Sequence, residues 1–282
     1  MLDVMFYEAF DEEEKLLRKF LPKHINADFT PDTIQEYRFP QLTSSLISIR
    51  TQSIIPVAWA KDLKGILTRS TGYDHLLTFR KRTKSKIPCG YLPEYCSRAV
   101  AEQAMMMVMA LLRKLKFQLA HFNSFNRDRL TGKECQGKNL LVVGVGHIGR
   151  ELVDIAKGLR MRVKGVDLVR RVKNLEYVPL SQGLVWADII ICALSLTKKT
   201  NRMLGYTALK KVKRGTIFVN IARGEISPTK DLRRLLDENR LGGVGLDVYD
   251  EEATLAEHLR DKKRRKTSAI KTIWELKDRP SV

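Results

Sequence analysis

Residues 139–149 constrain the fold of this chain more than any other segment. They read as an apolar strand that runs into Gly144 and Gly146, followed by a helix that contains Gly149. A second apolar strand then ends at Asp167, 18 residues after Gly149. A glycine-rich turn between a strand and a helix, with an acidic residue at the end of the next strand, is typical of a dinucleotide-binding βαβ unit.

Each position of this motif has a physical role in binding a dinucleotide. Gly144 permits the tight turn, Gly146 lets the backbone approach a pyrophosphate, and Gly149 lets the helix pack against the sheet. The first helical turn, at His147 and Ile148, presents free N–H groups and the positive end of the helix dipole to the phosphates. The segment therefore predicts a Rossmann-type unit, with His147 as a residue beside the phosphates and not a catalyst.

Asp167 indicates which dinucleotide the unit binds. A carboxylate at this place accepts hydrogen bonds from both ribose hydroxyls and repels a 2′-phosphate, so it favours NAD over NADP. Arg170 and Arg171 follow within four residues and leave some use of NADP open. We expect NAD as the cofactor.

From residue 139 onward, apolar strands alternate regularly with amphipathic helices such as 228–239. This alternation predicts an α/β fold in which a doubly wound parallel sheet is covered by helices on both faces. The expected strands are 139–144, 162–167, 188–194, 216–221 and 243–248.

The first part of the chain has a different organisation. Residues 3–9 read as a strand and 11–20 as a helix with an apolar face. A helix from 98 to about 116, with Ser97 as its N-cap, is apolar nearly all round and should be buried between layers or at a subunit contact. The change between the two organisations falls between about 90 and 135.

Five segments, in order along nearly the whole chain, resemble one known family: residues 68–76, 95–102, 144–149, 220–225 and 246–252. That family is the D-isomer-specific 2-hydroxyacid dehydrogenases, and the first and last segments are most similar to its D-lactate dehydrogenase branch. The resemblance implies a flavodoxin-like substrate domain over 1–95 without its C-terminal return, and an NAD-binding Rossmann domain over 96–275. Residues 276–282 would start the crossover back, and the protein would be a homodimer through its cofactor domain.

The resemblance also assigns roles to side chains. Arg223 matches the arginine that binds the substrate carboxylate and polarises the ketone, a task that suits a planar cation that keeps its charge. Glu252 matches the partner of a general-acid histidine, although three consecutive acids (250–252) leave its register open by one residue. Asp247 matches a residue near the nicotinamide carboxamide. The loop that meets the substrate carboxylate through backbone N–H groups is matched by Arg69, Ser70 and Gly72.

No residue of this sequence matches the histidine that serves as the general acid in the family. In the family, the histidine lies in a Thr-Pro-His segment a short way past a stretch that 276–282 resembles, and the sequence stops at Val282. Of the five histidines, only His258 lies near Glu252. We expect weak or no turnover for residues 1–282 with cofactor binding retained, the chain being either a fragment or an inactive relative.

The expected function is NAD-dependent interconversion of a 2-keto acid and a D-2-hydroxy acid by hydride transfer. The alternative is a catalytically silent NAD-binding regulator, because the family also contains nucleotide-sensing corepressors. The side chain of the substrate stays open, with pyruvate, glyoxylate and branched or aromatic 2-keto acids all compatible with the motifs.

Charge and composition limit the other partners. The net charge of +19 lies mostly in residues 97–282, with 37 basic and 20 acidic side chains, and includes a basic run over 260–266. No aromatic residue interleaves that run, so we interpret it as a solvated surface and expect no nucleic acid. The most apolar stretch, 99–112, is too short to span a membrane. With an acidic start and four cysteines that form no C-x-x-C pair, we expect a cytoplasmic protein without a metal site.

Overall fold

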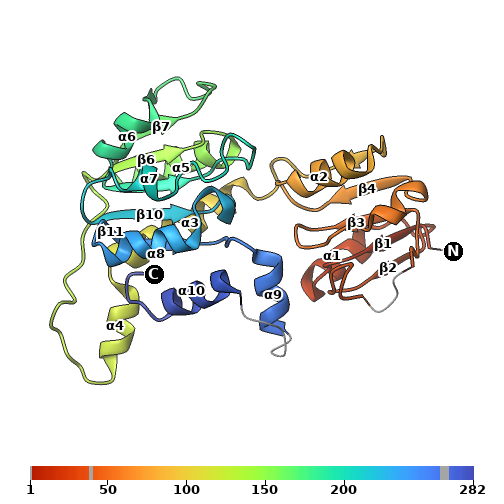
Figure 1. Cartoon of the computed structure of the whole chain (residues 1–282), viewed down its shortest axis with the longest axis horizontal. Helices are drawn as coiled ribbons and strands as arrows, with labels where there is room; N and C mark the ends of the chain where they lie inside the picture. The colour runs from red at the N-terminus through yellow and green to blue at the C-terminus, as the bar shows by residue number, and fades with distance from the viewer. Residues whose placement is uncertain (1, 38–40, 261–266) are drawn as a thin grey trace. The chain divides into compact units, whose positions relative to one another are not determined.

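The structure is a computed structural model that describes residues 2–37, 41–260 and 267–282, apart from the side chain of Glu257. The chain divides into two compact units, Met1–Tyr95 and Cys96–Val282 (Figure 1). Each unit is built on its own parallel sheet, and each has its own apolar core.

The first unit contains a five-stranded parallel sheet in the order β2-β1-β3-β4-β5. This is the strand order of flavodoxin-like folds, as expected for the smaller domain. Met5, Ile47 and Ile66 lie on one face of the sheet and pack with Trp59 and Phe79 from the helical segments. The elements are β1 (Val4–Phe6), α1 (Asp11–Phe20), β2 (Ala27–Phe29), β3 (Leu46–Ile49), η1 (Val57–Lys61), β4 (Gly65–Thr68), α2 (Asp74–Thr83) and β5 (Cys89–Gly90).

The second unit contains a six-stranded parallel sheet in the order β11-β10-β9-β6-β7-β8. Counted from β6, this is the 3-2-1-4-5-6 order of the Rossmann fold, which confirms the predicted fold class. The predicted strands are all present, with ends that differ by a few residues. They are β6 (Asn139–Val143), β7 (Arg162–Val166), β9 (Ile189–Cys192), β10 (Thr216–Asn220) and β11 (Leu241–Leu246), joined by the short edge strand β8 (Glu176–Tyr177).

Helices cover both faces of this second sheet. Because successive strand residues point to opposite faces, Leu140 and Val142 pack into the core with α3 and α5, whereas Leu141 and Val143 pack into the core on the other face. Nearly continuous apolar strands are typical of a sheet buried on both sides. The helices are α3 (Ser97–Leu112), α5 (His147–Gly158), α6 (Leu180–Trp186), α7 (Tyr206–Leu209) and α8 (Thr229–Asp237), with the short turn η2 (Gly224–Ile226).

The long helix predicted from 98 to about 116 is wrong in two respects. It ends at Leu112 and a second helix, α4 (Leu115–Phe122), begins after Lys114, whose φ of 56° is left-handed. Its N-cap is Cys96 and not Ser97, whose buried hydroxyl has no hydrogen-bond partner among the residues that the structure describes. Within the single chain the side chain of Met106 is 54 % exposed, as expected for a helix that lies at a subunit contact.

The end of the chain folds along the edge of the second sheet. After α9 (Glu252–Arg260) and α10 (Ser268–Lys277), the backbone N–H of Val244 donates to the carbonyl of Ser281 at 2.8 Å. The Nζ of Lys116 donates to the carbonyls of Lys277, Arg279 and Val282 at 2.6, 3.0 and 2.7 Å. The start of α4 and the C-terminal residues therefore lie side by side, and 276–282 are packed within the second unit (Figure 1).

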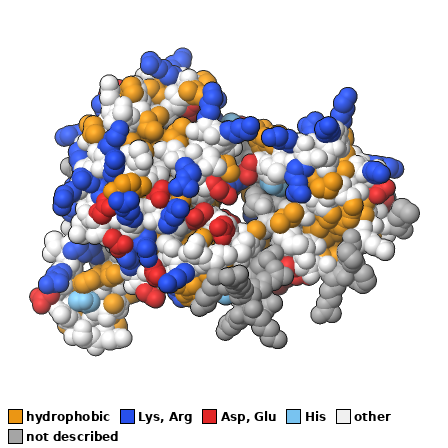
Figure 2. Space-filling model, in the orientation of Figure 1, with side chains coloured by type: hydrophobic (Ala, Val, Ile, Leu, Met, Phe, Trp, Pro, Cys, Tyr) orange, Lys and Arg blue, Asp and Glu red, His pale blue; other side chains and the backbone are white. Residues whose placement is uncertain are grey.

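Two observations bear on the other partners that the sequence raised. Figure 2 shows Lys and Arg side chains spread over the visible face of the second unit, with Asp and Glu between them. Lys262, Lys263, Arg264, Arg265 and Lys266 of the basic run lie outside the described residues. Within the described residues, no helix has the length and apolar character needed to cross a membrane.

Candidate dinucleotide and substrate site

The glycine motif forms a turn with almost no spare volume. Gly144 follows β6 with a φ of 98°, and a Cβ there would lie 2.6 Å from the carbonyl oxygen of Ala193. A Cβ on Gly149 would overlap the carbonyl oxygen of Gly144, so α5 packs directly on the turn. These two positions explain why the first and third glycines of the motif carry no side chain.

Gly146 is different, because the space around it is open. A Cβ on this residue would have no atom of the described residues within 4 Å. Gly146 is the N-cap of α5, and no side chain caps the first N–H groups of the helix. His147, the first helical residue, is exposed, and its Nδ1 lies 2.9 Å from Nη2 of Arg150. Open space and uncapped N–H groups at a helix N-terminus fit the pyrophosphate of a dinucleotide.

Asp167 is held in place at the carboxyl end of β7. Its Oδ2 accepts the N–H of Val145 at 2.7 Å, and its Oδ1 accepts the N–H of Val169 at 3.0 Å. The guanidinium of Arg171 lies 3.8 Å from Oδ1. The carboxylate is thereby fixed against the glycine turn, where it fits the role of accepting ribose hydroxyls.

Arg223 lies in a turn that begins where β10 ends. Asn220, the last residue of β10, donates to the carbonyl of Arg223 at 2.9 Å and to the hydroxyl of Ser227 at 2.7 Å. The Arg223 side chain is half-buried, and its Nη1 donates to the carbonyl of Ala222 at 2.8 Å. The guanidinium is therefore held at the carboxyl edge of the sheet, where open α/β sheets bind ligands.

Gly224 brings this turn against the segment that carries the acidic residues. A Cβ on Gly224 would overlap the backbone of Tyr249 and Asp250. The N–H of Asp247 also donates to the carbonyl of Asn220 at 3.1 Å, so the ends of β10 and β11 are joined. Two segments about 25 residues apart in sequence thus meet in one place, as parallel strand ends do at a sheet edge.

The three consecutive acids differ in their surroundings. Asp250 accepts the N–H of Thr229 at 3.2 Å and also the Thr229 hydroxyl, at the start of α8. Glu251 is exposed with a left-handed φ of 57°, whereas Glu252 is half-buried as the first residue of α9. Burial raises the pKa of the Tyr249 hydroxyl, and the charges of Asp247 and Glu252 add to this effect.

The predicted substrate loop of the first unit follows β4. Arg69 is buried there, and its guanidinium donates to the carboxylate of Glu13 at 2.8 Å, to the hydroxyl of Ser48 at 2.9 Å and to the carbonyl of Tyr7 at 2.8 Å. Its backbone N–H donates to the carbonyl of Ile49 at 2.8 Å. Arg69 therefore holds the loop in place through bonds inside the unit.

Ser70 and Gly72 form the bend of the same loop, where Ser70 is buried and Gly72 is half-buried. The Ser70 hydroxyl donates to the carbonyl of Gly72 at 2.7 Å, and its oxygen lies 2.7 Å from the hydroxyl of Thr68. Nε2 of His75 lies 3.1 Å from the same Thr68 hydroxyl. These hydrogen bonds link the loop to the end of β4 and to α2, and they fix the loop backbone.

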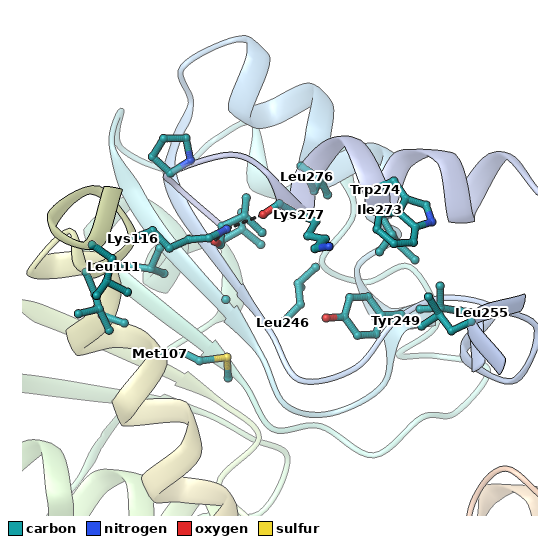
Figure 3. Close-up of a pocket in the computed structure, with 18 residues that line it drawn as sticks. Met107, Leu111, Lys116, Leu246, Tyr249, Leu255, Ile273, Trp274, Leu276 and Lys277 are labelled. Atoms are coloured by element: carbon teal, nitrogen blue, oxygen red, sulfur yellow. Dashed lines mark hydrogen bonds between the residues drawn. The ribbon is translucent and has the colours of Figure 1, made fainter. Parts of the chain in front are cut away.

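An apolar cavity of about 600 Å³ borders the outer edge of β11. Figure 3 shows Met107 and Leu111 of α3 on one side of it, Trp274 of α10 on another, and Leu246 and Tyr249 between them. The Nζ of its lining residue Lys116 is engaged by backbone carbonyls. Because the lining offers so few polar groups, this cavity is unsuited to polarising a ketone.

Several residues of the site had no assigned role in the sequence. Asn220 lay inside a segment of the family resemblance, but its role depends on a turn that sequence does not display. Gln103 of α3, whose Nε2 lies 3.3 Å from Oδ1 of Asp247, is 144 residues away from it and gave no local signal. Among the described residues, no group of three or more His, Cys, Asp or Glu side chains is placed to hold a metal ion.

Comparison with known proteins agrees with this arrangement. Residues 105–269 match the sequence profile of the D-isomer specific 2-hydroxyacid dehydrogenase NAD binding domain. A D-lactate dehydrogenase of Curvularia clavata is 30% identical over 208 residues, which cover 72% of this chain and 60% of that protein. A glyoxylate reductase of Pyrococcus furiosus is 32% identical over 216 residues, which cover 71% of this chain and 63% of that protein. The chain thus spans about three fifths of the length of these relatives.

Solved structures show the same fold. The D-lactate dehydrogenase of Aquifex aeolicus, crystallised with NAD and lactic acid, has a TM-score of 0.87 and 25% identity and covers 99% of this chain and 86% of its own. The apo-structure of D-lactate dehydrogenase from Escherichia coli has a TM-score of 0.76 at 23% identity. The match covers 92% of this chain and 86% of that protein.

Fold and glycine turn define the second unit as a dinucleotide-binding domain of the doubly wound α/β class. The profile match covers more than half of the chain, and it identifies the dinucleotide of this domain as NAD. The chain belongs to the D-isomer-specific 2-hydroxyacid dehydrogenase family.

Proposed function

We propose that this chain interconverts a 2-keto acid and a D-2-hydroxy acid with NAD as the hydride carrier. The observation that carries the proposal is the contact of Gly224 with the backbone of Tyr249 and Asp250, since it joins the Arg223 turn to the segment of Asp247 and Glu252. A fixed cation beside acidic groups, on a sheet edge that also carries the glycine turn, suits the reduction of a ketone next to a carboxylate.

Each group then has a chemical task. Bound NADH supplies the hydride. Arg223 binds the substrate carboxylate and polarises the ketone oxygen, where negative charge grows as the alcohol forms. Ser70 and Gly72 offer backbone N–H groups to the carboxylate, with Arg69 holding their loop. Asp247 contacts the carboxamide end of the cofactor, and Gly144, Gly146, His147, Ile148, Gly149 and Asp167 bind the rest of it.

Proton transfer to the new alkoxide requires a general acid. We infer that Glu252 orients the general acid, a histidine that the family resemblance places in a segment outside these residues. His258 is buried in α9, the same helix as Glu252. A general acid typically contributes about 100- to 10,000-fold to the rate of such a reaction.

The substrate is proposed from the comparisons with known proteins, and the assembly from exposed side chains of the second unit. The names of the relatives point to pyruvate and glyoxylate as the first substrates to try. We infer a homodimer through α3 and α4, because Met106, Leu119 and Phe122 expose apolar side chains there. None of the four cysteines forms a disulfide within the described residues, which fits a reducing, cytoplasmic environment.

The test is NADH oxidation by purified residues 1–282 with pyruvate, glyoxylate and longer 2-keto acids, beside NADH binding. The variant R223Q should bind NADH as the wild type does and lose the response to every acid. If R223Q reduces the same acids at the wild-type rate, Arg223 has no such role. Tight NADH binding without turnover of any acid, and without binding of a 2-keto acid analogue, would favour an NAD-binding regulator.

A further inference from the structure

Asn220 occupies an unusual position for a polar side chain. It is fully buried at the end of β10, inside the second unit. A buried amide that is left unpaired is costly, so such a residue persists only where its hydrogen bonds are made.

The side chain of Asn220 makes three hydrogen bonds within one short turn. Its Nδ2 donates to the carbonyl of Arg223 at 2.9 Å and to the Ser227 hydroxyl at 2.7 Å, and its Oδ1 accepts the N–H of Ala222 at 2.9 Å. Both amide hydrogens and one lone pair are therefore used. The bonds reach the residues on either side of Gly224, so the amide closes the turn from inside.

The same residue also contacts the neighbouring segment. Its backbone carbonyl accepts the N–H of Asp247 at 3.1 Å. Asn220 is thus bonded to the turn that carries Arg223 and to Asp247, the residue that follows β11. A long side chain such as arginine reaches a defined place only when the backbone from which it starts is fixed.

We propose that Asn220 is a positioning residue that sets where the Arg223 guanidinium meets the substrate carboxylate. The inference rests on the proposed function, because it takes Arg223 as the group that binds the 2-keto acid. It assigns to Asn220 no contact with substrate or cofactor. Displacing such a group by about 1 Å can cost on the order of 100-fold in the step that needs it.

The variant N220D changes mainly one of the three bonds. An aspartate still accepts the N–H of Ala222, and the Ser227 hydroxyl can turn to donate to it. Only the carbonyl of Arg223 loses its donor and faces a negative oxygen. The variant N220S, which removes the amide and leaves space, provides the same test if N220D does not fold cooperatively.

The measurement is the affinity of the NADH complex for oxamate, a non-reacting analogue of a 2-keto acid, followed by NADH fluorescence. Oxamate undergoes no hydride or proton transfer in the complex, so its Kd reports binding alone and does not depend on the rate of turnover. We expect the oxamate Kd of N220D to rise by about 10- to 100-fold, with the NADH Kd unchanged. The matched control is N139S, which removes a half-buried amide that donates to the carbonyl of Trp186 at 3.1 Å where β6 begins.

The outcomes separate this inference from the function on which it rests. Loss of oxamate binding in R223Q together with wild-type binding in N220D overturns the positioning role alone. Equal weakening of NADH and oxamate in N220D, or an equal loss in N139S, shows a merely structural role and also overturns it. A wild-type NADH complex that does not bind oxamate overturns the proposed function and, with it, this inference.

Discussion

The carboxylate of Asp250 accepts two hydrogen bonds from Thr229, one from the backbone N–H at 3.2 Å and one from the hydroxyl. Thr229 is the first residue of α8, so the negative charge lies at the positive end of that helix. The carboxylate of Asp250 therefore attaches the segment of three consecutive acids (250–252) to the start of α8. This favours Glu252 over Asp250 as the acid of the proposed site.

This contact predicts different effects for neighbouring acids. D250A removes a side-chain acceptor at a helix N-terminus and should lower the free energy of unfolding by ~1–2 kcal/mol. E251Q, which changes an exposed residue, should leave it unchanged. Urea unfolding followed by circular dichroism measures both. An equal loss in the two variants would contradict the assignment of Asp250.

The second and third glycines of the motif should respond differently to a single methyl group. G149A places a Cβ on the carbonyl of Gly144 and should destabilise the fold by ~1–3 kcal/mol, as overpacking does. G146A meets no atom of the described residues within 4 Å, so its Tm should equal that of the wild type. Its NADH Kd should nevertheless rise, because the open space is where the pyrophosphate approaches the backbone.

Calorimetry gives the Tm values and fluorescence titration the NADH affinities. If G146A binds NADH as tightly as the wild type, the pyrophosphate does not lie at Gly146. If G149A keeps its wild-type Tm, α5 is able to shift away from the turn, and the third glycine has no packing role.

These glycines also show how much sequence could predict. Local spacing was enough to predict the glycine turn, the strands of the second sheet and the position of Asp167 at the end of a strand. Each of these predictions depends on residues that are close together in the sequence. The break between α3 and α4 was missed, since a left-handed Lys114 leaves no mark in composition. The bonds of Asn220 and Asp250 depend on turns that form only when β10 and β11 are already paired.

Arg69 illustrates a different limit. The family resemblance assigned it to a loop that meets the substrate, and in the structure it follows β4. In sequence, a charged residue beside a glycine turn looks the same whether it faces a ligand or the core. Its bonds to Glu13 and Ser48 bring together residues 56 and 21 positions apart. Only the folded unit distinguishes a buried, fully bonded guanidinium from an available one.

Cys192 predicts a pH-dependent loss of stability. Burial in β9 raises the pKa of its thiol from 9.0 to about 12. Above pH 9 the thiolate forms in the unfolded chain but not in the folded one, so alkali favours unfolding by at most ~1.4 kcal/mol for each pH unit. Below pH 9 both states hold the proton, and the thiol makes no pH-dependent contribution.

The comparison with C192A isolates this effect, because all other titrating groups are shared. The difference in the free energy of unfolding between wild type and C192A should be constant at neutral pH and should shift against the wild type above about pH 9. Urea unfolding over this range measures it. A difference that stays constant up to pH 11 would show that Cys192 is not desolvated as the fold implies.

The proposed homodimer predicts a further result. Phe122 in α4 and Phe125 just after it are 76 % and 81 % exposed, and Leu119 is 66 % exposed. Large apolar side chains that gather in one segment of a monomer are uncommon and mark a contact surface. We expect residues 1–282 to sediment as a dimer, because a second copy would cover this surface; a stable interface typically buries about 800 Å² on each partner.

The variant F122D tests this surface without touching the cofactor turn. A charge inside an apolar contact is costly to bury, so F122D should sediment as a monomer at concentrations where the wild type is a dimer. The control V185D places a charge on α6, where the side chain is 52 % exposed and has no part in the proposed contact. V185D should remain a dimer. If F122D is also dimeric, the subunits meet through another face, and the exposure of α4 needs a different partner.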